Sequence, residues 1–405
     1  MARRPTVAES KFTPSEIELS AGNVLRKVQT PALGIGAVAL AASFVGALVW
    51  QRQFFQAWLV AYMYWLGMSL GCTALLMMQY ISGGRWGAAI RRPLEAGASN
   101  VPLMAVCFIP IVLGMKTLYP WADPALVTAS AVLQIKSVYM NPTMFMLRGV
   151  IYFTIWITLS TLLVSWSRQS DTSGYDEARA GRVSVLSHVG IIVWVLSMSL
   201  AAVDWAMSLE VGWFSHIYPL MFAGGQILTA LTLAIQVSAR IADHKPVSSV
   251  LSADRFHDLG KLLLAFVMVW TYFQLSQFII IWGANLPEEV EWYIVRNTGG
   301  WHILTLGLFL LHFVVPFGLL LSASRKKNPM SIAAVASLLC VMRYVDLYWW
   351  ITPSFSPTSF YVHPLHLTTV LGIGGVWVWR YIGALAAYPV LAVHDPVVAA
   401  ELEHA

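Results

Sequence analysis

The chain has 405 residues, of which 58% are hydrophobic and only 11% are charged. Soluble globular proteins usually carry about 25% charged residues, so this composition excludes an ordinary soluble protein and leaves no polar stretch long enough for a separate soluble domain. The net charge of +5 does not indicate nucleic-acid binding, because the basic residues are dispersed among short loops rather than gathered in one patch.

Ten hydrophobic stretches follow one another along the chain. Each is long enough to cross a hydrocarbon core of about 30 Å as a helix. Backbone groups in lipid must be satisfied within the segment, and the stretches lack the alternation of barrel strands, so we predict an all-α integral membrane protein. The predicted spans are residues 31–50, 54–81, 100–119, 143–166, 187–207, 216–239, 259–283, 301–323, 329–351 and 366–388.

The loops between these spans alternate in their content of lysine and arginine. The two tails and the even-numbered loops hold eighteen basic residues. The odd-numbered loops and their edges hold five, which are Arg52, Lys116, Lys136, Arg148 and Arg296. Cytoplasmic loops carry the excess of positive charge, so both termini are predicted to be cytoplasmic. We therefore expect a cytoplasmic N-terminal tail over residues 1–30, a ten-span domain over 31–388 and a cytoplasmic C-terminal tail over 389–405.

Patterns typical of metal centres do not occur. Cys72, Cys107 and Cys340 lie in three different predicted spans and form no C-x-x-C pair. A transmembrane haem needs two histidines at matching depth, and only His312 lies near the middle of a span. We therefore expect neither a metal site, nor catalytic residues, nor a directly bound redox cofactor in this chain.

Ionisable residues occur inside several spans, where a charge is costly and is usually paired or functional. Asp204 has no opposite charge three or four positions away, so its partner must come from another helix. Arg343 and Asp346 are three residues apart, share one helical face and can neutralise each other. The sequence leaves open whether these groups are structural ion pairs or parts of a proton path.

The seventh span adds a polar stripe, in which Thr271, Gln274 and Gln277 recur every three residues. Such side chains can hold a file of water or bond neighbouring helices together. If protons cross this chain, the expected cytoplasmic approach is His188, Lys261 and Tyr272. The expected periplasmic approach is Asp204, His216, Arg343 and Asp346, with His312 at mid-membrane.

Three segments resemble a known family. They are residues 54–122, which begin FFQAWLVAYMYWLGMSLGCTALLMMQYISGGRWGAAIRR, residues 255–293, which read RFHDLGKLLLAFVMVWTYFQLSQFIIIWGANLPEEVEWY, and residues 361–369, which read YVHPLHLTT. Together they resemble the second NrfD-type (polysulfide-reductase-like) membrane subunit of bacterial alternative complex III. The similarity extends over essentially the whole chain from about residue 25.

The resemblance implies two four-helix bundles plus a helical pair in the bacterial inner membrane. It also implies a complex that oxidises quinol and passes electrons through iron–sulfur clusters and c-type haems held by other subunits. The implied partners are a paralogous NrfD-type subunit with the quinol site, an iron–sulfur subunit, multihaem and monohaem cytochrome c subunits, a terminal oxidase and lipids. The implied role of this chain is a scaffold and a proton-translocation candidate.

Two alternatives remain at this point. The chain could bind quinone itself, for which Asp204, His216 and His363 are the candidates near the periplasmic face. It could instead be a solute transporter, whose signature would be broken helices at matching places in two halves. The prolines inside the spans suggest no such repeat, so transport is the least favoured of the three functions.

Overall fold

The computed structural model describes residues 14–245, 247–392 and 395–403, and it is 85% helical, with no β-strand in these ranges. Ten of its helices are long and apolar enough to cross a membrane. The predicted all-α fold is therefore confirmed. Five of the ten predicted spans, the second, sixth, eighth, ninth and tenth, begin and end within three residues of the observed ones.

The membrane-crossing elements are α1 (Pro14–Val49), α2 (Gln51–Ser82), α3 (Arg85–Ala98) continued by α4 (Val101–Cys107) and α5 (Ile109–Leu113), α9 (Pro142–Ser173), α10 (Glu177–Trp205), α11 (Tyr218–Ile241), α13 (Ala253–Ala284), α15 (His302–Gly307) and α16 (Val315–Leu321) joined by a π-helical turn (Leu308–Val314), α18 (Pro329–Ile351) and α19 (Pro364–Ala386). The shorter helices are α6 (Met115–Leu118), α7 (Pro124–Ala129), α8 (Ala131–Lys136), α12 (Val247–Val250), α14 (Pro287–Asn297), α17 (Ala323–Lys327) and α20 (Pro396–Glu403).

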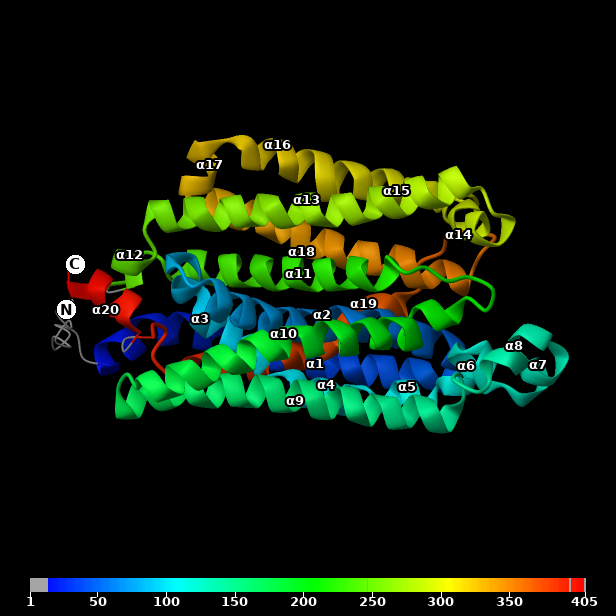
Figure 1. Ribbon diagram of the computed structural model, residues 1–405, viewed down its shortest axis with the longest axis horizontal. Helices are drawn as coiled ribbons and strands as arrows, with labels where there is room; N and C mark the ends of the chain where they lie inside the picture. Colours follow the sequence, from blue (N-terminus) through cyan, green and yellow to red (C-terminus); the bar gives the residue numbers. More distant parts are fainter. Residues whose placement is uncertain (1–13, 246, 393–394, 404–405) are drawn as a thin grey trace.

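The spans pack as two groups of four and one pair (Figure 1). The first bundle contains α2, α3–α5, α9 and α10, and the second contains α11, α13, α15–α16 and α18. The two bundles meet through α2 and α11, while α1 pairs with α19 and this pair lies against α2. Contact on several sides explains why nearly every side chain of α2 from Phe54 to Met77 is buried.

The two ends of the molecule differ. The beginning of α1 lies at the same end as α3, α12, α17 and α20, and we call it the terminal end. The opposite end, which carries α7, α8 and α14, is the distal end (Figure 1). These names describe only the molecule and carry no assumption about which side of a membrane each end faces.

Capping residues fix the starts of two spans close to where the sequence predicts them. The Asn141 side chain accepts a hydrogen bond from the Met144 amide at 2.9 Å, with a proline at the first helical position of α9. Asn328 does the same for the Ser331 amide at 2.9 Å before α18. An asparagine cap followed by proline satisfies free amides and presets the helical backbone, so the helix begins there.

The predicted third span is wrong at both ends. Residues 85–98 were expected to form a loop, but they form helix α3, which packs against α2, α9, α11 and α19. Arg91, Arg92 and Glu95 deter a hydropathy-based assignment, yet all three are buried and have partners inside the protein. The apolar helices of this span then end at Leu113, and α6 follows as a separate short helix.

The predicted tails also contain structure. Helix α1 already begins at Pro14, so part of the expected tail over residues 1–30 is helical, while residues 1–13 lie outside the described residues. Within the expected tail over residues 389–405, Pro396–Glu403 form helix α20, which packs against α3 and α12. The assignment of both tails to the cytoplasm stays a prediction.

A close approach of backbones holds α1 against α19, and it gives a first prediction. A Cβ atom added to Gly36 would lie 2.8 Å from the Cα atom of Gly375, which belongs to the opposing backbone. Gly36→Leu should therefore force the helices apart and lower the free energy of unfolding by about 2–3 kcal/mol. Gly34→Leu is the matched control, because a Cβ there meets nothing within 4 Å. Thermal unfolding in detergent measures both, and equal stability of the two variants would contradict the close packing.

Candidate functional site

The second bundle encloses a buried ion pair, which we call the Asp346 cluster. Arg343 and Asp346 are both buried and their side chains are paired, as their spacing in the sequence predicts. The carboxylate also accepts hydrogen bonds from Trp270 Nε1 at 3.0 Å, Trp350 Nε1 at 2.9 Å and Gln274 Nε2 at 3.4 Å. Four donors around two oxygens suit a carboxylate anion, which accepts but cannot donate.

His312 lies beside this cluster, against the ring of Trp270. It is fully buried, and its ring centroid is 4.1 Å from that of Trp270. Neither ring nitrogen has a hydrogen-bond partner among the described residues. Trp270 thus touches His312 through its ring and Asp346 through its N–H. Three of the predicted proton-path residues, His312, Arg343 and Asp346, are thereby brought into one region.

The backbone around His312 is irregular. The residue sits on the π-helical turn Leu308–Val314, which is followed by Pro316 in the first turn of α16. Proline has no N–H to give to the preceding turn, which favours a local change of helical period. Single π-helical turns inside α-helices occur frequently at functional sites. The turn and the unpartnered imidazole therefore mark the same place in the eighth span.

The first bundle contains a second buried carboxylate, that of Asp204. Its oxygens accept hydrogen bonds from Arg148 Nε at 2.7 Å, Arg148 Nη2 at 3.0 Å and the Tyr152 hydroxyl at 2.9 Å. The Arg148 guanidinium also lies 3.8 Å from the ring centroid of Tyr139. Both partners of Asp204 come from α9, so the prediction that its partner comes from another helix is confirmed.

Sequence reasoning missed the roles of Arg148 and Tyr152. Arg148 was counted only as a basic residue at a loop edge, although it lies inside the predicted fourth span. Its four-residue spacing from Tyr152 puts both side chains on one face of α9, which was the available signal. Which helix this face meets was not encoded in that spacing.

From Tyr152, the partner of Asp204, further polar side chains follow along α9 toward the terminal end. Tyr152, Trp156 and Ser160 recur at four-residue spacing on its buried face. Trp156 Nε1 donates to the Ser197 hydroxyl of α10 at 2.9 Å. Further along, the Ser167 hydroxyl donates to Glu95 at 2.5 Å, and the apolar Leu163 and Val164 separate it from Ser160. The row of polar side chains along α9 is therefore interrupted between Ser160 and Ser167.

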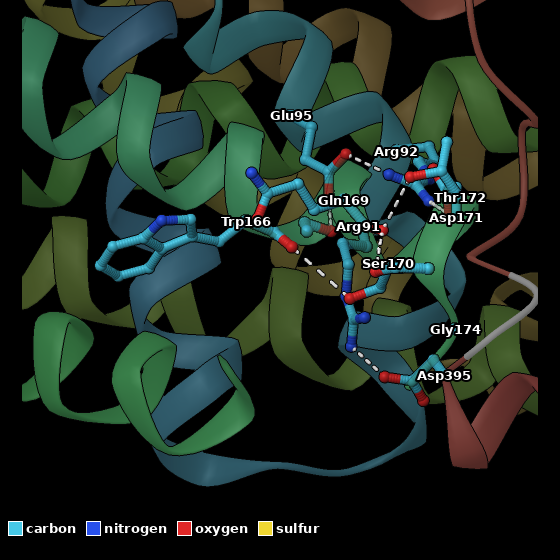
Figure 2. Close-up of polar contacts among 12 residues, drawn as sticks. Arg91, Arg92, Glu95, Trp166, Gln169, Ser170, Asp171, Thr172, Gly174 and Asp395 are labelled. Atoms are coloured by element: carbon cyan, nitrogen blue, oxygen red, sulfur yellow. Dashed lines mark hydrogen bonds and ion pairs between the residues drawn. The ribbon is translucent and has the colours of Figure 1, made fainter. Parts of the chain in front are cut away.

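Glu95 belongs to an arginine–carboxylate cluster at the terminal end (Figure 2). Arg92 Nη1 lies 2.6 Å from Glu95 Oε2, and the same guanidinium pairs with Asp171 of α9. Arg91 Nη2 lies 2.7 Å from Asp395 Oδ2, in the segment before α20. Figure 2 shows the two arginines of α3 pointing in these two directions. The sequence predicts a loop over this segment, so Glu95 is not among the predicted site residues.

These arginines line a cavity of about 290 Å³ between α2, α3, α9 and α10. At about 30 Å³ per molecule, it has room for about ten waters. Its polar lining includes Tyr80, Arg179 and Asp176, together with five residues labelled in Figure 2, which are Arg91, Arg92, Ser170, Asp171 and Asp395. The cavity therefore has room for water beside Ser167 of α9, whose hydroxyl donates to Glu95.

Four predicted proton-path residues lie on the outer surface instead of in the interior. Tyr272 is 65% exposed, and His188 is exposed with its Nδ1 2.8 Å from the Ser184 carbonyl oxygen of its own helix. Lys261 is exposed and pairs with Asp258 at 3.1 Å, and His216 is exposed beside Phe214. The structure does not bring His188, Lys261 and Tyr272 together into the expected approach.

The quinone-site candidates have separate surroundings. Asp204 is paired within the first bundle, whereas His363 precedes α19 and its Nδ1 accepts a hydrogen bond from the Leu365 amide at 3.3 Å. The His363 ring packs edge-on against Trp50. His216 lies on the outer surface before α11. Asp204, His216 and His363 each contact different neighbours, so they do not line one site for a quinone ring.

The distal end holds a buried arginine that also was counted only as a loop charge. Arg296 of α14 donates to the Trp350 carbonyl at 2.6 Å and the Trp292 carbonyl at 3.1 Å, and its guanidinium lies 3.6 Å from the Trp292 ring centroid. Burial lowers the pKa of Arg296 to about 10, which still leaves it protonated at neutral pH. It ties α14 to the end of α18.

Within the described ranges, no three histidine, cysteine or acidic side chains are placed to hold one metal ion. Comparison with protein-family models found no match for the chain, and a search of curated proteins found no sequence of significant similarity. The functional conclusion therefore depends on the buried ionisable groups of the spans and on the sequence resemblance.

Proposed function

We propose that this chain is a membrane-integral subunit of a quinol-oxidising respiratory complex of the alternative complex III type, corresponding to its second NrfD-type subunit, ActF. It would serve as a scaffold and a proton-translocation subunit without a redox centre of its own. Iron–sulfur clusters and c-type haems would belong to its partners. The segments at residues 54–122, 255–293 and 361–369 support this assignment, as do ten spans that pack in two groups of four and a pair.

The distribution of basic residues supports an orientation in the bacterial inner membrane. The terminal end carries the basic α17 with Arg325, Lys326 and Lys327, and the first turn of α3 with Arg85. By the positive-inside rule, these residues support a cytoplasmic terminal end and a periplasmic distal end. In this orientation the cavity beside Glu95 opens toward the cytoplasm.

The observation that carries the proton role is the buried His312 beside the Asp346 cluster. An ionisable side chain in the interior of a span is costly to keep and is by default a functional candidate. A structural histidine would be held by hydrogen bonds, whereas both nitrogens of His312 lack a partner among the described residues. An imidazole in this state can accept a proton from water or from a neighbouring group without breaking an existing bond.

The polar stripe of α13 gives this region a connection toward the distal end. Gln274 donates to Asp346, and Gln277 accepts a hydrogen bond from the Ser215 hydroxyl at 2.6 Å, just before α11. The stripe therefore joins α13 to α18 and to the segment before α11, and it sets polar groups between Asp346 and the distal end. The geometry thus supports two polar routes, one in each bundle.

Loss of the chain tests the proposed role. Membranes of a strain that lacks it should lose most quinol-dependent reduction of the acceptor cytochrome, because the complex cannot assemble around a missing scaffold. Reintroduction of the wild-type chain should restore the rate. An unchanged rate of quinol oxidation in the deletion strain would exclude this function.

The Asp204 site gives a second prediction, which separates stability from proton transfer. Asp204→Asn should destabilise the fold by leaving Arg148 without its buried counter-charge. Arg148→Gln combined with Asp204→Asn removes both charges and should recover most of that stability, but neither side chain can then titrate. In sealed proteoliposomes, the double variant should translocate fewer protons per electron than wild type at a similar rate of quinol oxidation. A wild-type ratio would exclude Asp204 as an obligatory carrier.

A further inference from the structure

A groove of about 540 Å³ runs between the start of α3 and the first turns of α13 at the terminal end. It lies on the outside of the molecule, apart from the buried ion pairs of the two bundles. Its lining combines charged and apolar side chains, which are Arg85, Trp86, Arg255, Asp258, Lys261, Leu262 and Ala265.

The charged part of the groove is cationic. Arg85, Arg255 and Lys261 line the groove with one carboxylate, Asp258, which pairs with Arg255 and Lys261. A second carboxylate, Glu401, pairs with Arg255 and Arg85. Three positive and two negative groups leave a net charge of +1. Arg255 is held by its two partners, whereas the Arg85 and Lys261 side chains are 67% and 57% exposed. Arg85 lies 3.9 Å from Glu401 and Lys261 lies 3.1 Å from Asp258, but exposed ion pairs of this kind are weak, so both cations can turn toward a ligand.

The beginning of α3 adds to the positive potential. Gly83 and Gly84 have φ values of 65° and 91°, and Gly84 offers no side chain to cap the helix. The first-turn amides of this 14-residue helix therefore lack a side-chain acceptor. The positive end of the helix dipole lies at Arg85 and Trp86, where the groove begins, and it favours an anion there.

The groove continues into an apolar stripe along α13. Leu262 and Ala265 form its floor, and Val269 and Tyr272 follow on the same outward face at the spacing of helical turns. All of these lie on a membrane-crossing helix, whose outer face would contact lipid. Trp86 stands at the boundary between the cationic and apolar parts, a position typical of interfacial aromatic residues.

We propose that this groove binds an anionic phospholipid. The phosphate lies between Arg85 and Lys261 at the start of α3, and one acyl chain lies along Leu262, Ala265 and Val269. Basic pockets between transmembrane helices at the cytoplasmic surface are known sites for anionic lipid headgroups, and the apolar stripe distinguishes a lipid from a free anion. This inference does not depend on the redox or proton role of the chain.

Native mass spectrometry of the full-length, delipidated protein in mild detergent tests this site. Phosphatidylglycerol and phosphatidylcholine with the same acyl chains are titrated separately, and the wild type should bind one phosphatidylglycerol more tightly than phosphatidylcholine. Arg85→Gln combined with Lys261→Gln should weaken that binding by about 30-fold, taking about 1 kcal/mol per basic residue and about 1.4 kcal/mol per factor of ten.

Two further variants separate the possible causes. Arg240→Gln combined with Arg325→Gln removes two exposed charges at the same end, neither of which lines the groove, and should leave the affinity unchanged. Ala265→Trp fills the acyl-chain floor with all charges intact, and it should also weaken phosphatidylglycerol binding. Wild-type affinity in the Arg85/Lys261 variant would overturn the site. Wild-type affinity in Ala265→Trp, with inorganic phosphate competing, would show a phosphate site and overturn the lipid assignment.

Discussion

Asp346→Asn is expected to lower the free energy of unfolding by about 3–5 kcal/mol, the largest stability effect of any single substitution in the second bundle. The substitution keeps the shape of the side chain but leaves Arg343 as an unpaired cation in the interior. Trp270 donates to Oδ2 and Trp350 to Oδ1, so the single amide oxygen of asparagine can accept from only one of them, and the loss combines an unpaired donor with the uncompensated charge. Unfolding in detergent, followed by the loss of buried tryptophan signal, measures it.

Two variants control this result. Asp254→Asn breaks an ion pair with Lys327, at 3.0 Å, in which both partners are largely exposed, so no measurable change is expected. Arg343→Met combined with Asp346→Leu removes both buried charges and should recover most of the lost stability. If Asp346→Asn were as stable as Asp254→Asn, the buried pair would not be ionised in the folded protein.

His312→Leu is expected to abolish most proton translocation through the second bundle while leaving the fold intact. Leucine has a similar volume, and the substitution removes no hydrogen bond to a described residue, because neither ring nitrogen makes one. Stability should therefore be unchanged or slightly higher. In sealed proteoliposomes, the number of protons moved per electron should fall, whereas the rate of quinol oxidation under uncoupled conditions should stay near that of wild type.

His366→Leu is the matched control for this experiment. His366 is also buried, but it lies in the first turn of α19, with its Nδ1 3.2 Å from the His363 carbonyl oxygen, and it does not contact Trp270. Its loss should cost some stability and leave the proton ratio unchanged. A wild-type proton ratio in His312→Leu would leave His312 as a packing residue.

The number of spans and most of their limits could be predicted from the sequence because hydrophobic length and capping are local properties. The asparagine–proline starts of α9 and α18 are examples. Helix α3 could not be predicted in the same way. Its charges are neutralised inside the protein, by Asp395 for Arg91 and by Glu95 and Asp171 for Arg92, and two of these partners are distant in the sequence.

In the candidate site, too, contacts within one helix could be predicted, whereas contacts between helices could not. The Arg343–Asp346 pair follows from a three-residue spacing on one helix, so the sequence predicts it. The Asp204–Arg148 pair and the packing of Trp270 on His312 join different helices, and one sequence does not show which faces meet. For the same reason Tyr272 was expected in a path, although the rotation of α13 turns Gln274 and Gln277 inward and Tyr272 outward.

Extraction of the native complex tests the proposed function most directly. Membranes are solubilised in mild detergent, the chain is purified through an affinity tag, and its partners are identified by mass spectrometry and by haem absorption. We predict that it is recovered with an iron–sulfur subunit, multihaem and monohaem cytochrome c subunits and a second NrfD-type protein. Recovery as a lone homo-oligomer that transports a solute and carries no haem-containing partner would contradict this function.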